Sequence, residues 1–166
     1  LLALLGTAQS PAQLTATSYA TNFVVAGSLY SFDVYAQRTG ANLIRVGTSN
    51  FIVNTNRAGL SPIGMTLTNV NQKFTAPGTT NGDYAEMRVD TIIGAAFTGK
   101  VAVTIRFLGN GDFGTGQLLS NATGTPPGER ICTVNMPIIN PSLTAALTWD
   151  VVNSALTDSR SQPVTN

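Results

Sequence analysis

YSFDVYAQRTGANLIRVGTSNFIVNTNRAGL, residues 30–60, is the stretch that decides the fold. From Tyr30 to Gln37, apolar and polar side chains alternate with the period of two that is typical of a strand with one buried face. The alternation resumes at Ile44 and runs to Asn54, with small and polar residues at 47–50 that predict a bulge or bend. The stretch therefore predicts two long β-strands joined through residues 38–40.

The same pattern continues on both sides of this stretch. Glycine, proline and asparagine turns separate the apolar runs at intervals of about ten residues, which is typical of an antiparallel sandwich. We expect further strands at residues 13–25, 63–70, 84–89, 101–107, 129–136 and 143–152. Apolar residues at helical spacing are absent, and at most a short helical turn is expected near Ala58 or residues 141–146. The chain is predicted to be all-β, an antiparallel β-sandwich of jelly-roll type.

Two short blocks carry a resemblance to a known family. NFIV at residues 50–53, followed by NTN and Leu60, resembles the second-strand signature of cohesin-like modules. GKVAVTIRF at residues 99–107 is similar to a later cohesin strand. The layout also resembles N-terminal surface domains of proteins exported by the bacterial type IX pathway. The resemblance covers residues 29–149 and implies a cohesin-like sandwich. Its motifs match no dockerin-recognition residues, so that partner is not implied.

The first twelve residues differ from the rest of the chain. LLALLGTAQS is an apolar run that ends in small residues, which indicates the remnant of a secretory signal peptide. The alternative is a retained strand that completes the sheet of a neighbouring subunit. We expect residues 13–166 to form a single sandwich domain. We also expect this domain to be truncated at the C-terminus, because the polar run from Asn153 stops where a closing strand should begin.

The composition indicates an extracellular or cell-surface protein. Only 10% of the residues are charged, and the net charge of +1 comes without any basic cluster. This excludes the usual electrostatic footprint of a nucleic-acid partner, and no membrane insertion of the mature form is expected. Cys132 is the single cysteine, so an internal disulfide is impossible and a buried thiol is expected.

The sequence argues against an enzyme. It contains no histidine, which removes the most common general base and the usual nucleophilic triads. The acidic residues Asp83, Glu86 and Asp90 are the nearest approach to a carboxylate pair. Strand alternation places Tyr84, Glu86 and Arg88 together on a face exposed to water, which favours a salt-bridged surface over an active site.

No cofactor or metal is expected. The glycine-rich segment of residues 108–116 lacks the Lys-Ser or Lys-Thr pair that a phosphate-binding loop requires. Asn110 and Asp112 offer oxygen ligands at alternate positions. However, the acidic residue that closes a calcium loop is missing, so the segment is interpreted as a turn.

Three functions remain open. The first is a non-catalytic binding or adhesion module that contacts protein or glycan through a sandwich face or through its end loops. The second is a subunit of an extracellular fibre built from copies of itself, and the third is an accessory carbohydrate-binding module of a larger enzyme. A glycan ligand would stack on exposed aromatic rings. The candidates are Tyr35, Tyr84, Phe113 and Trp149, of which Tyr35 is favoured and Trp149 more commonly belongs to a core.

Overall fold

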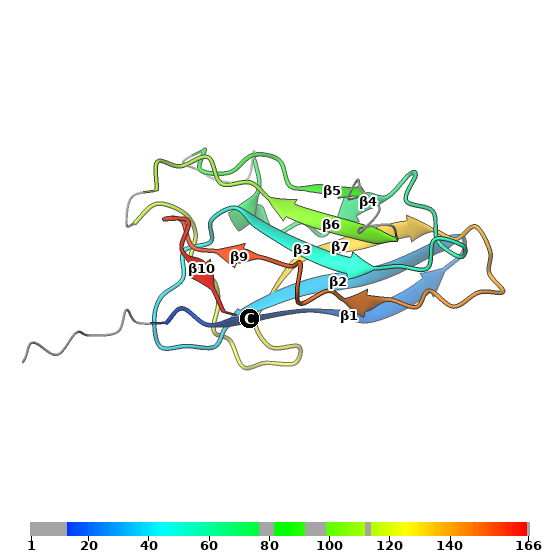
Figure 1. The fold of residues 1–166 in the computed structure, drawn as a ribbon, viewed down its shortest axis with the longest axis horizontal. Coiled ribbons are helices and arrows are strands. Elements are labelled where there is room, and N and C mark those ends of the chain that lie inside the picture. Colours follow the sequence, from blue (N-terminus) through cyan, green and yellow to red (C-terminus); the bar gives the residue numbers. More distant parts are fainter. Residues whose placement is uncertain (1–12, 77–81, 92–98, 112–113, 166) are drawn as a thin grey trace, which may run out of the picture.

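The computed structural model describes residues 13–76, 82–91, 99–111 and 114–165, and they form a β-sandwich (Figure 1). One sheet has the strand order β1-β2-β7-β4 and the other β5-β6-β3-β8, with antiparallel pairing throughout. A two-stranded ribbon, β9 with β10, follows at the C-terminal end. The predicted all-β antiparallel sandwich is confirmed. The described residues contain no α-helix and therefore no helix that could span a membrane.

The strands and the single 3-10 turn have the following bounds. They are β1 Ala16–Ala26, β2 Leu29–Arg38, β3 Ser49–Asn54, β4 Thr66–Thr68, η1 Gln72–Phe74, β5 Arg88–Thr91, β6 Lys100–Ile105, β7 Glu129–Pro137, β8 Thr148–Trp149, β9 Leu156–Thr157 and β10 Pro163–Val164.

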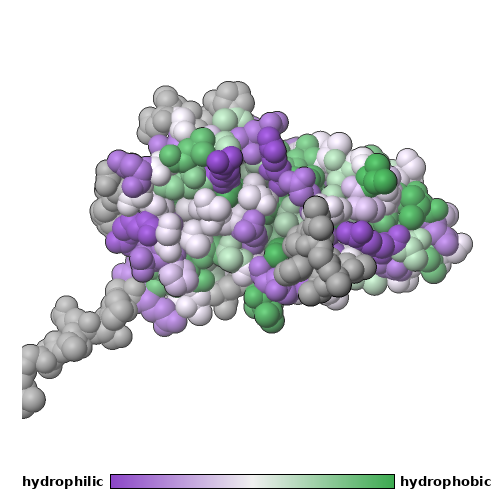
Figure 2. Space-filling view, turned by 45° about the horizontal axis from the view of Figure 1, so that its top comes forward, coloured by the Kyte–Doolittle hydropathy of each residue, from purple (hydrophilic) through white to green (hydrophobic). Residues whose placement is uncertain are grey.

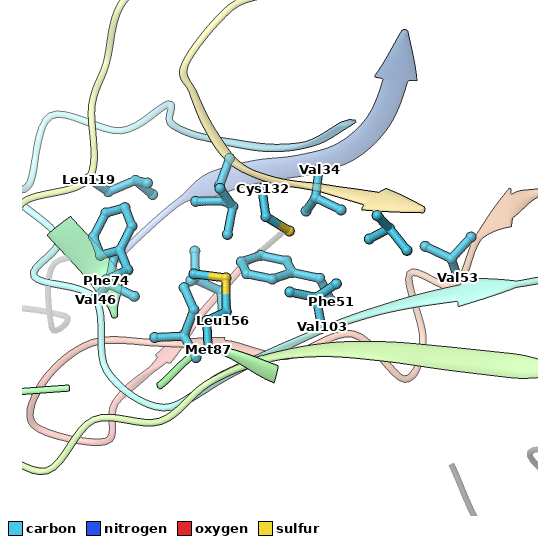
Figure 3. Close-up of a cluster of buried hydrophobic side chains, with 14 of the residues drawn as sticks. Val34, Val46, Phe51, Val53, Phe74, Met87, Val103, Leu119, Cys132 and Leu156 are labelled. Carbon is cyan, nitrogen blue, oxygen red and sulfur yellow. The ribbon is translucent and has the colours of Figure 1, made fainter. Parts of the chain in front are cut away.

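The core lies between the two sheets (Figure 3). In β2 the predicted inner residues Phe32, Val34 and Ala36 are fully buried. Phe51 and Val53 of β3 face them from the opposite sheet as part of the same cluster. The period-two pattern therefore predicted the buried face of both strands correctly.

The two strands of the opening stretch do not pair with each other. β2 and β3 belong to opposite sheets, so residues 39–48 cross from one sheet to the other. The predicted interruption is present: Arg45 and Val46 form only isolated bridges before β3 begins at Ser49. At Gly47 the backbone carbonyl of Asp158 leaves no space for a side chain.

The prediction for residues 84–89 was wrong at Tyr84. Its side chain was expected to face water, yet it is 1% exposed and belongs to the core. The strand in this region, β5, begins only at Arg88, and Tyr84 makes an isolated bridge with Phe107 instead. Because the segment before Arg88 is irregular, the strand alternation used for the prediction does not apply to it.

Two other strands are shorter than predicted. β4 covers Thr66–Thr68, and Asn69 directly after it has a φ of 49°. β8 covers Thr148–Trp149, and Ala146 shortly before it has a φ of 46°. Residues in the left-handed region interrupt the extended backbone, which explains why both runs were overpredicted.

Cys132 is completely buried, as predicted. Its position on β7 places the thiol between the sheets, and burial raises its pKa well above the usual range, with a further contribution from Asp33. A neutral buried thiol is a poor nucleophile, so its role in the folded protein is packing.

Candidate functional site

The β1–β2 hairpin extends beyond the covered part of the core. Val25 pairs with Tyr30, which lies on the inner face of β2, and should therefore be buried. Instead Val25 is 64% exposed, whereas Ala36 at the far end of β2 is fully buried. The inner face of the sheet is thus open to solvent beside the β1–β2 turn. Figure 1 shows this turn at the right-hand end of the molecule.

A bulge in β1 shapes this open end. Asn22 and Phe23 together stand opposite Phe32, because the register shifts between Thr21 and Val24. Asn22 takes a φ of 52°, and its amide donates a 2.8 Å hydrogen bond to Asp33. The Phe23 ring then lies 6.4 Å from Phe32 and 6.5 Å from Tyr30, centroid to centroid. The bulge therefore adds an aromatic ring to the open inner face.

Residues 138–145 form the opposite wall. The amide of Ile138 donates to the Ser28 carbonyl at 2.8 Å, and that of Ile139 donates to the Gly59 carbonyl at 2.9 Å. Asn56 donates from its backbone to the Ala145 carbonyl and from its side chain to the Thr144 carbonyl, both at 3.0 Å. The first bond ties the start of the segment to the β1–β2 turn, and the others anchor the segment to residues 56–59.

Between the hairpin and this wall lies a groove of about 560 Å³, which we call the end groove. It is lined by Val25, Gly27, Ser28, Tyr30, Leu60, Ile138, Pro141, Leu143, Thr144 and Ala145. Its volume is within the range of small-molecule and peptide side-chain sites. None of the lining residues is charged, so the groove suits aliphatic or aromatic groups.

Exposed apolar residues surround the end groove. The space-filling view shows apolar side chains gathered at the right-hand end of the molecule (Figure 2). The large apolar residues exposed at this end are Phe23, Val25, Ile139 and Leu143, together with Val24 and Leu29 on the outer face of the sheet. Exposed apolar side chains gathered at one end of a protein commonly mark an interaction site.

The four aromatic candidates do not form one site. Tyr35 lies half-buried on the outer face of β2 and stacks on Tyr19, with centroids 5.8 Å apart and an interplanar angle of 19°. Tyr84 is enclosed in the core and presents no ring face to solvent. Trp149 packs against Phe51 at 6.2 Å and against the core, as its context suggested. Phe113 lies outside the described residues.

Tyr19 was missed by the sequence reasoning. The signal was available, because Tyr19 falls on the outward alternation of residues 13–25. Only the pairing register of β1 with β2, however, shows that it stands opposite Tyr35. Its hydroxyl donates to the Pro127 carbonyl at 2.6 Å, which fixes the ring against residues 121–128.

Two members of the acidic cluster, Glu86 and Asp90, share a small hollow with basic side chains. Glu86 and Asp90 line a hollow of about 140 Å³ together with Arg88, Thr104 and Arg106. The expected salt bridges are absent: within the described ranges, none of these charged groups has an ion-pair partner inside 4.0 Å. Asp83 accepts a 3.3 Å hydrogen bond from the Gly116 amide and so serves a loop.

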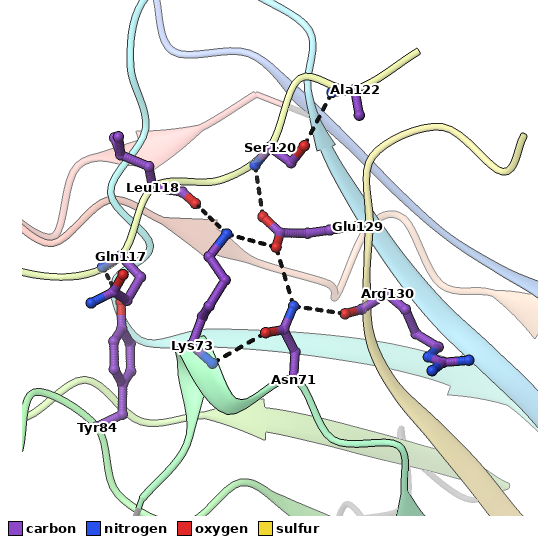
Figure 4. A network of polar contacts seen from close by, with 9 residues as sticks. All are labelled: Asn71, Lys73, Tyr84, Gln117, Leu118, Ser120, Ala122, Glu129 and Arg130. Carbon is purple, nitrogen blue, oxygen red and sulfur yellow. Dashed lines mark hydrogen bonds and ion pairs between the residues drawn. The ribbon is translucent and has the colours of Figure 1, made fainter. Parts of the chain in front are cut away.

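A network around Glu129 holds the loops at the opposite end of the molecule (Figure 4). The Glu129 carboxylate accepts from the Ser120 amide at 2.7 Å, from Lys73 Nζ at 2.8 Å and from Asn71 Nδ2 at 3.1 Å. Each carboxylate oxygen therefore has a donor, which makes this network structural. No group of metal-ligating side chains occurs in the part of the chain that the structure describes. Asp112, which the sequence offered as a calcium ligand, lies outside that part.

Comparison with known proteins finds similar structures but no similar sequence family. No family model and no curated protein matches the chain. The sixth cohesin of scaffoldin B from Acetivibrio cellulolyticus, solved in complex with a mutant Cel5 dockerin, is similar with a TM-score of 0.51 and 16% identity, over 94% of this chain and 92% of that one.

Two further cohesins are similar to the same degree. A cohesin module of a family 33 glycoside hydrolase from Clostridium perfringens has a TM-score of 0.51 and 11% identity, over 93% of this chain and 90% of that one. The cohesin of a type I cohesin–dockerin complex from Clostridium thermocellum has a TM-score of 0.51 and 11% identity, over 91% and 92%. At these identities the likeness shows the fold, a cohesin-like sandwich, as predicted.

Proposed function

We propose that this chain is a non-catalytic protein-binding module of a secreted or cell-surface protein, and that it binds its partner through the end groove. The end groove itself carries the proposal. It is an apolar, uncharged hollow formed by an uncovered part of the core, and it is bordered by exposed aliphatic and aromatic side chains. Burying these side chains against a partner removes apolar surface from water, which favours association.

The chemistry of the lining favours a protein partner over a glycan. A sugar ring needs several hydrogen-bonding groups for its hydroxyls, yet among the described residues only Ser28, Thr144 and Tyr30 bring polar side chains to the groove. Leu60 and Ile138 instead offer aliphatic contacts from inside it. Leucine, valine or phenylalanine side chains of a protein segment match this surface.

The similar structures support the same class of partner. Two of the three cohesins above were solved in complex with dockerins, which are proteins. We take from them only that a sandwich of this fold can serve as a protein-binding module. The surface proposed here rests on this chain's own residues.

A glycan-binding surface is a second candidate, favoured by the stacked Tyr19 and Tyr35 rings. Both rings are partly exposed on the outer face of the β1-β2-β7-β4 sheet. Arg130, directly opposite Tyr35 on β7, is 41% exposed and could donate to sugar hydroxyls. Parallel aromatic rings held in place are suited to stacking against the apolar face of a pyranose.

Panning the protein against a random peptide library displayed on phage, together with glycan-array binding, tests both candidates. Ala145→Trp places an indole in the groove, and Tyr35→Ala removes half of the aromatic pair. Ala122→Trp, in the exposed loop at the other end of the molecule, is the matched control for added aromatic surface. Circular dichroism establishes that each variant remains folded.

We expect peptides rich in aliphatic residues to bind the wild type and the Ala122→Trp control, and to lose about tenfold or more in affinity for Ala145→Trp. Binding of glycans that is abolished by Tyr35→Ala but unchanged by Ala145→Trp would favour the second candidate. Peptide binding that is equal in all variants would contradict the role of the end groove.

A further inference from the structure

We propose that the end groove receives residues 1–12 of a second copy of this chain, so that copies associate head to tail. The inference rests on the proposed function, because it names the protein segment that occupies the same groove. Residues 1–12 could instead be the remnant of a secretory leader. An apolar groove at the far end of the molecule is the observation that favours a retained segment.

Residues 1–12 and the end groove match in chemistry. Residues 1–5 are LLALL, and no residue among the first twelve is charged. The end groove is likewise uncharged, with Leu60, Ile138 and Leu143 among its lining residues. Apolar side chains from one copy would replace water against the uncovered apolar surface of the next.

Gln13, to which the segment is joined, and the end groove lie at opposite ends of the molecule. Gln13, where the segment joins the sandwich, donates from its side chain to Thr165 Oγ1 at 3.1 Å, and its backbone carbonyl accepts from Asn42 Nδ2 at 3.1 Å. β1 then runs the length of the sheet before it reaches the turn at Gly27, which borders the groove. Figure 1 shows the start of β1 near the C-terminal ribbon and its end at the other side of the molecule.

This separation favours a second copy over the chain's own groove. Eleven residues of β1 span roughly 35 Å. A segment of twelve residues reaches at most about 40 Å when fully extended. To enter its own groove, the segment would have to run back along all of β1, with almost no length left for the leucines to bind. A neighbouring molecule can approach without this constraint.

The backbone also offers a place for an added strand. β1 is the end strand of its sheet, and near the groove its only partner among the described strands is β2. The outer edge of β1 beside Val25 can therefore pair with an extended segment that enters the groove. A contact between opposite ends of neighbouring copies places them one after another, which favours open filaments over closed rings.

The test compares the full chain with a variant that lacks residues 1–12, using sedimentation velocity over a range of concentrations and electron microscopy. A fluorescein-labelled peptide of residues 1–12 is then titrated into the shortened protein. Ala145→Trp and the rim substitution Leu143→Asp should each block the groove, and Ala122→Trp is the control. Leu143 is 43% exposed, so its substitution should leave the fold intact.

We expect concentration-dependent filaments from the full chain and from Ala122→Trp, and monomers from the shortened protein and both groove variants. The peptide should bind the shortened protein at least about tenfold more tightly than it binds either groove variant. Filaments that persist without residues 1–12 would overturn the inference, as would a monomeric full chain. If library peptides bind the groove and the peptide of residues 1–12 does not, this inference fails while the proposed function stands; if neither binds, both fail.

Discussion

At the scale of single residues, Tyr84 connects segments that are distant in sequence. Its hydroxyl donates to the Val46 carbonyl at 2.6 Å and accepts from the Gln117 amide at 2.9 Å. Its ring meets Phe74 and Phe107 edge-on, with centroids 6.0 and 5.4 Å away. Burial, the largest cause, raises the pKa of Tyr84 to about 12. The phenol is therefore a neutral structural group.

This raised pKa predicts a loss of stability at high pH. The folded state holds the Tyr84 proton more tightly than the unfolded chain does, whose tyrosine pKa is about 10. The stabilisation is complete below pH 10 and should disappear as the pH rises from 10 towards 12. Urea unfolding across this range should show a steep decline in the free energy of unfolding for the wild type and a shallower one for Tyr84→Phe. Equal slopes would contradict this account of Tyr84.

Asn22 allows the conformation of the β1 bulge to be tested separately from its hydrogen bond. Asn22→Gly and Asn22→Ala both remove the donor to Asp33, but only glycine tolerates the φ of 52° without strain. We expect the alanine variant to be less stable than the glycine variant by about 1 kcal/mol, measured by urea unfolding.

Thr17 provides a control with the opposite sign. It lies in the regular part of β1 and is exposed. At this position Thr17→Gly should be less stable than Thr17→Ala, because glycine weakens a regular strand. If the difference in stability between the glycine and alanine variants were the same at positions 17 and 22, the backbone conformation of the bulge would not be what favours glycine at position 22.

At the scale of elements, Gly47 controls how the C-terminal ribbon packs on the sandwich. The Gly47 amide donates to the Thr157 carbonyl at 2.8 Å, and the Ser159 amide donates to the Arg45 carbonyl at 2.6 Å. The close approach of the Asp158 carbonyl depends on the missing side chain at Gly47. Leu156 and Val164 of the ribbon then complete the core.

Gly47→Ala should therefore cost about 2 kcal/mol in the free energy of unfolding, since backbone atoms must move to admit the methyl group. Gly124→Ala is the matched control, because a side chain at Gly124 would meet no atom within 4 Å. Its effect should stay within about 0.5 kcal/mol. Equal stability of the two variants in chemical denaturation would show that the ribbon does not depend on this contact.

The regular strands could be predicted from the sequence, whereas the end groove could not. β2, β6 and β7 follow a period of two or a continuous apolar run, and the structure places them as expected. The groove lies between the β1–β2 turn and residues 138–145, which dock against Asn56 and Gly59 far away in sequence. Such contacts depend on tertiary packing that local patterns do not encode.

At the scale of the whole molecule, the fold relies on its core. Cys132 is the single cysteine, so no disulfide restrains the chain. β7, which carries it, lies inside its sheet between β2 and β4 and faces the opposite sheet across the core. Solvent can reach the thiol only when this central strand is exposed. The reactivity of Cys132 therefore reports on the opening of the sandwich as a whole.

This predicts that a thiol reagent such as DTNB modifies the folded protein only through opening. The burial that raises the Cys132 pKa also suppresses the reactive thiolate. The modification rate should rise with urea in parallel with global unfolding. Cys132→Ser combined with Ala122→Cys supplies an exposed thiol whose rate should be fast and independent of urea. If Cys132 reacted as fast as this control, or at a rate unchanged by urea, the core would open locally at β7. The uncovered apolar surface would then extend from the end groove into the centre of the sandwich.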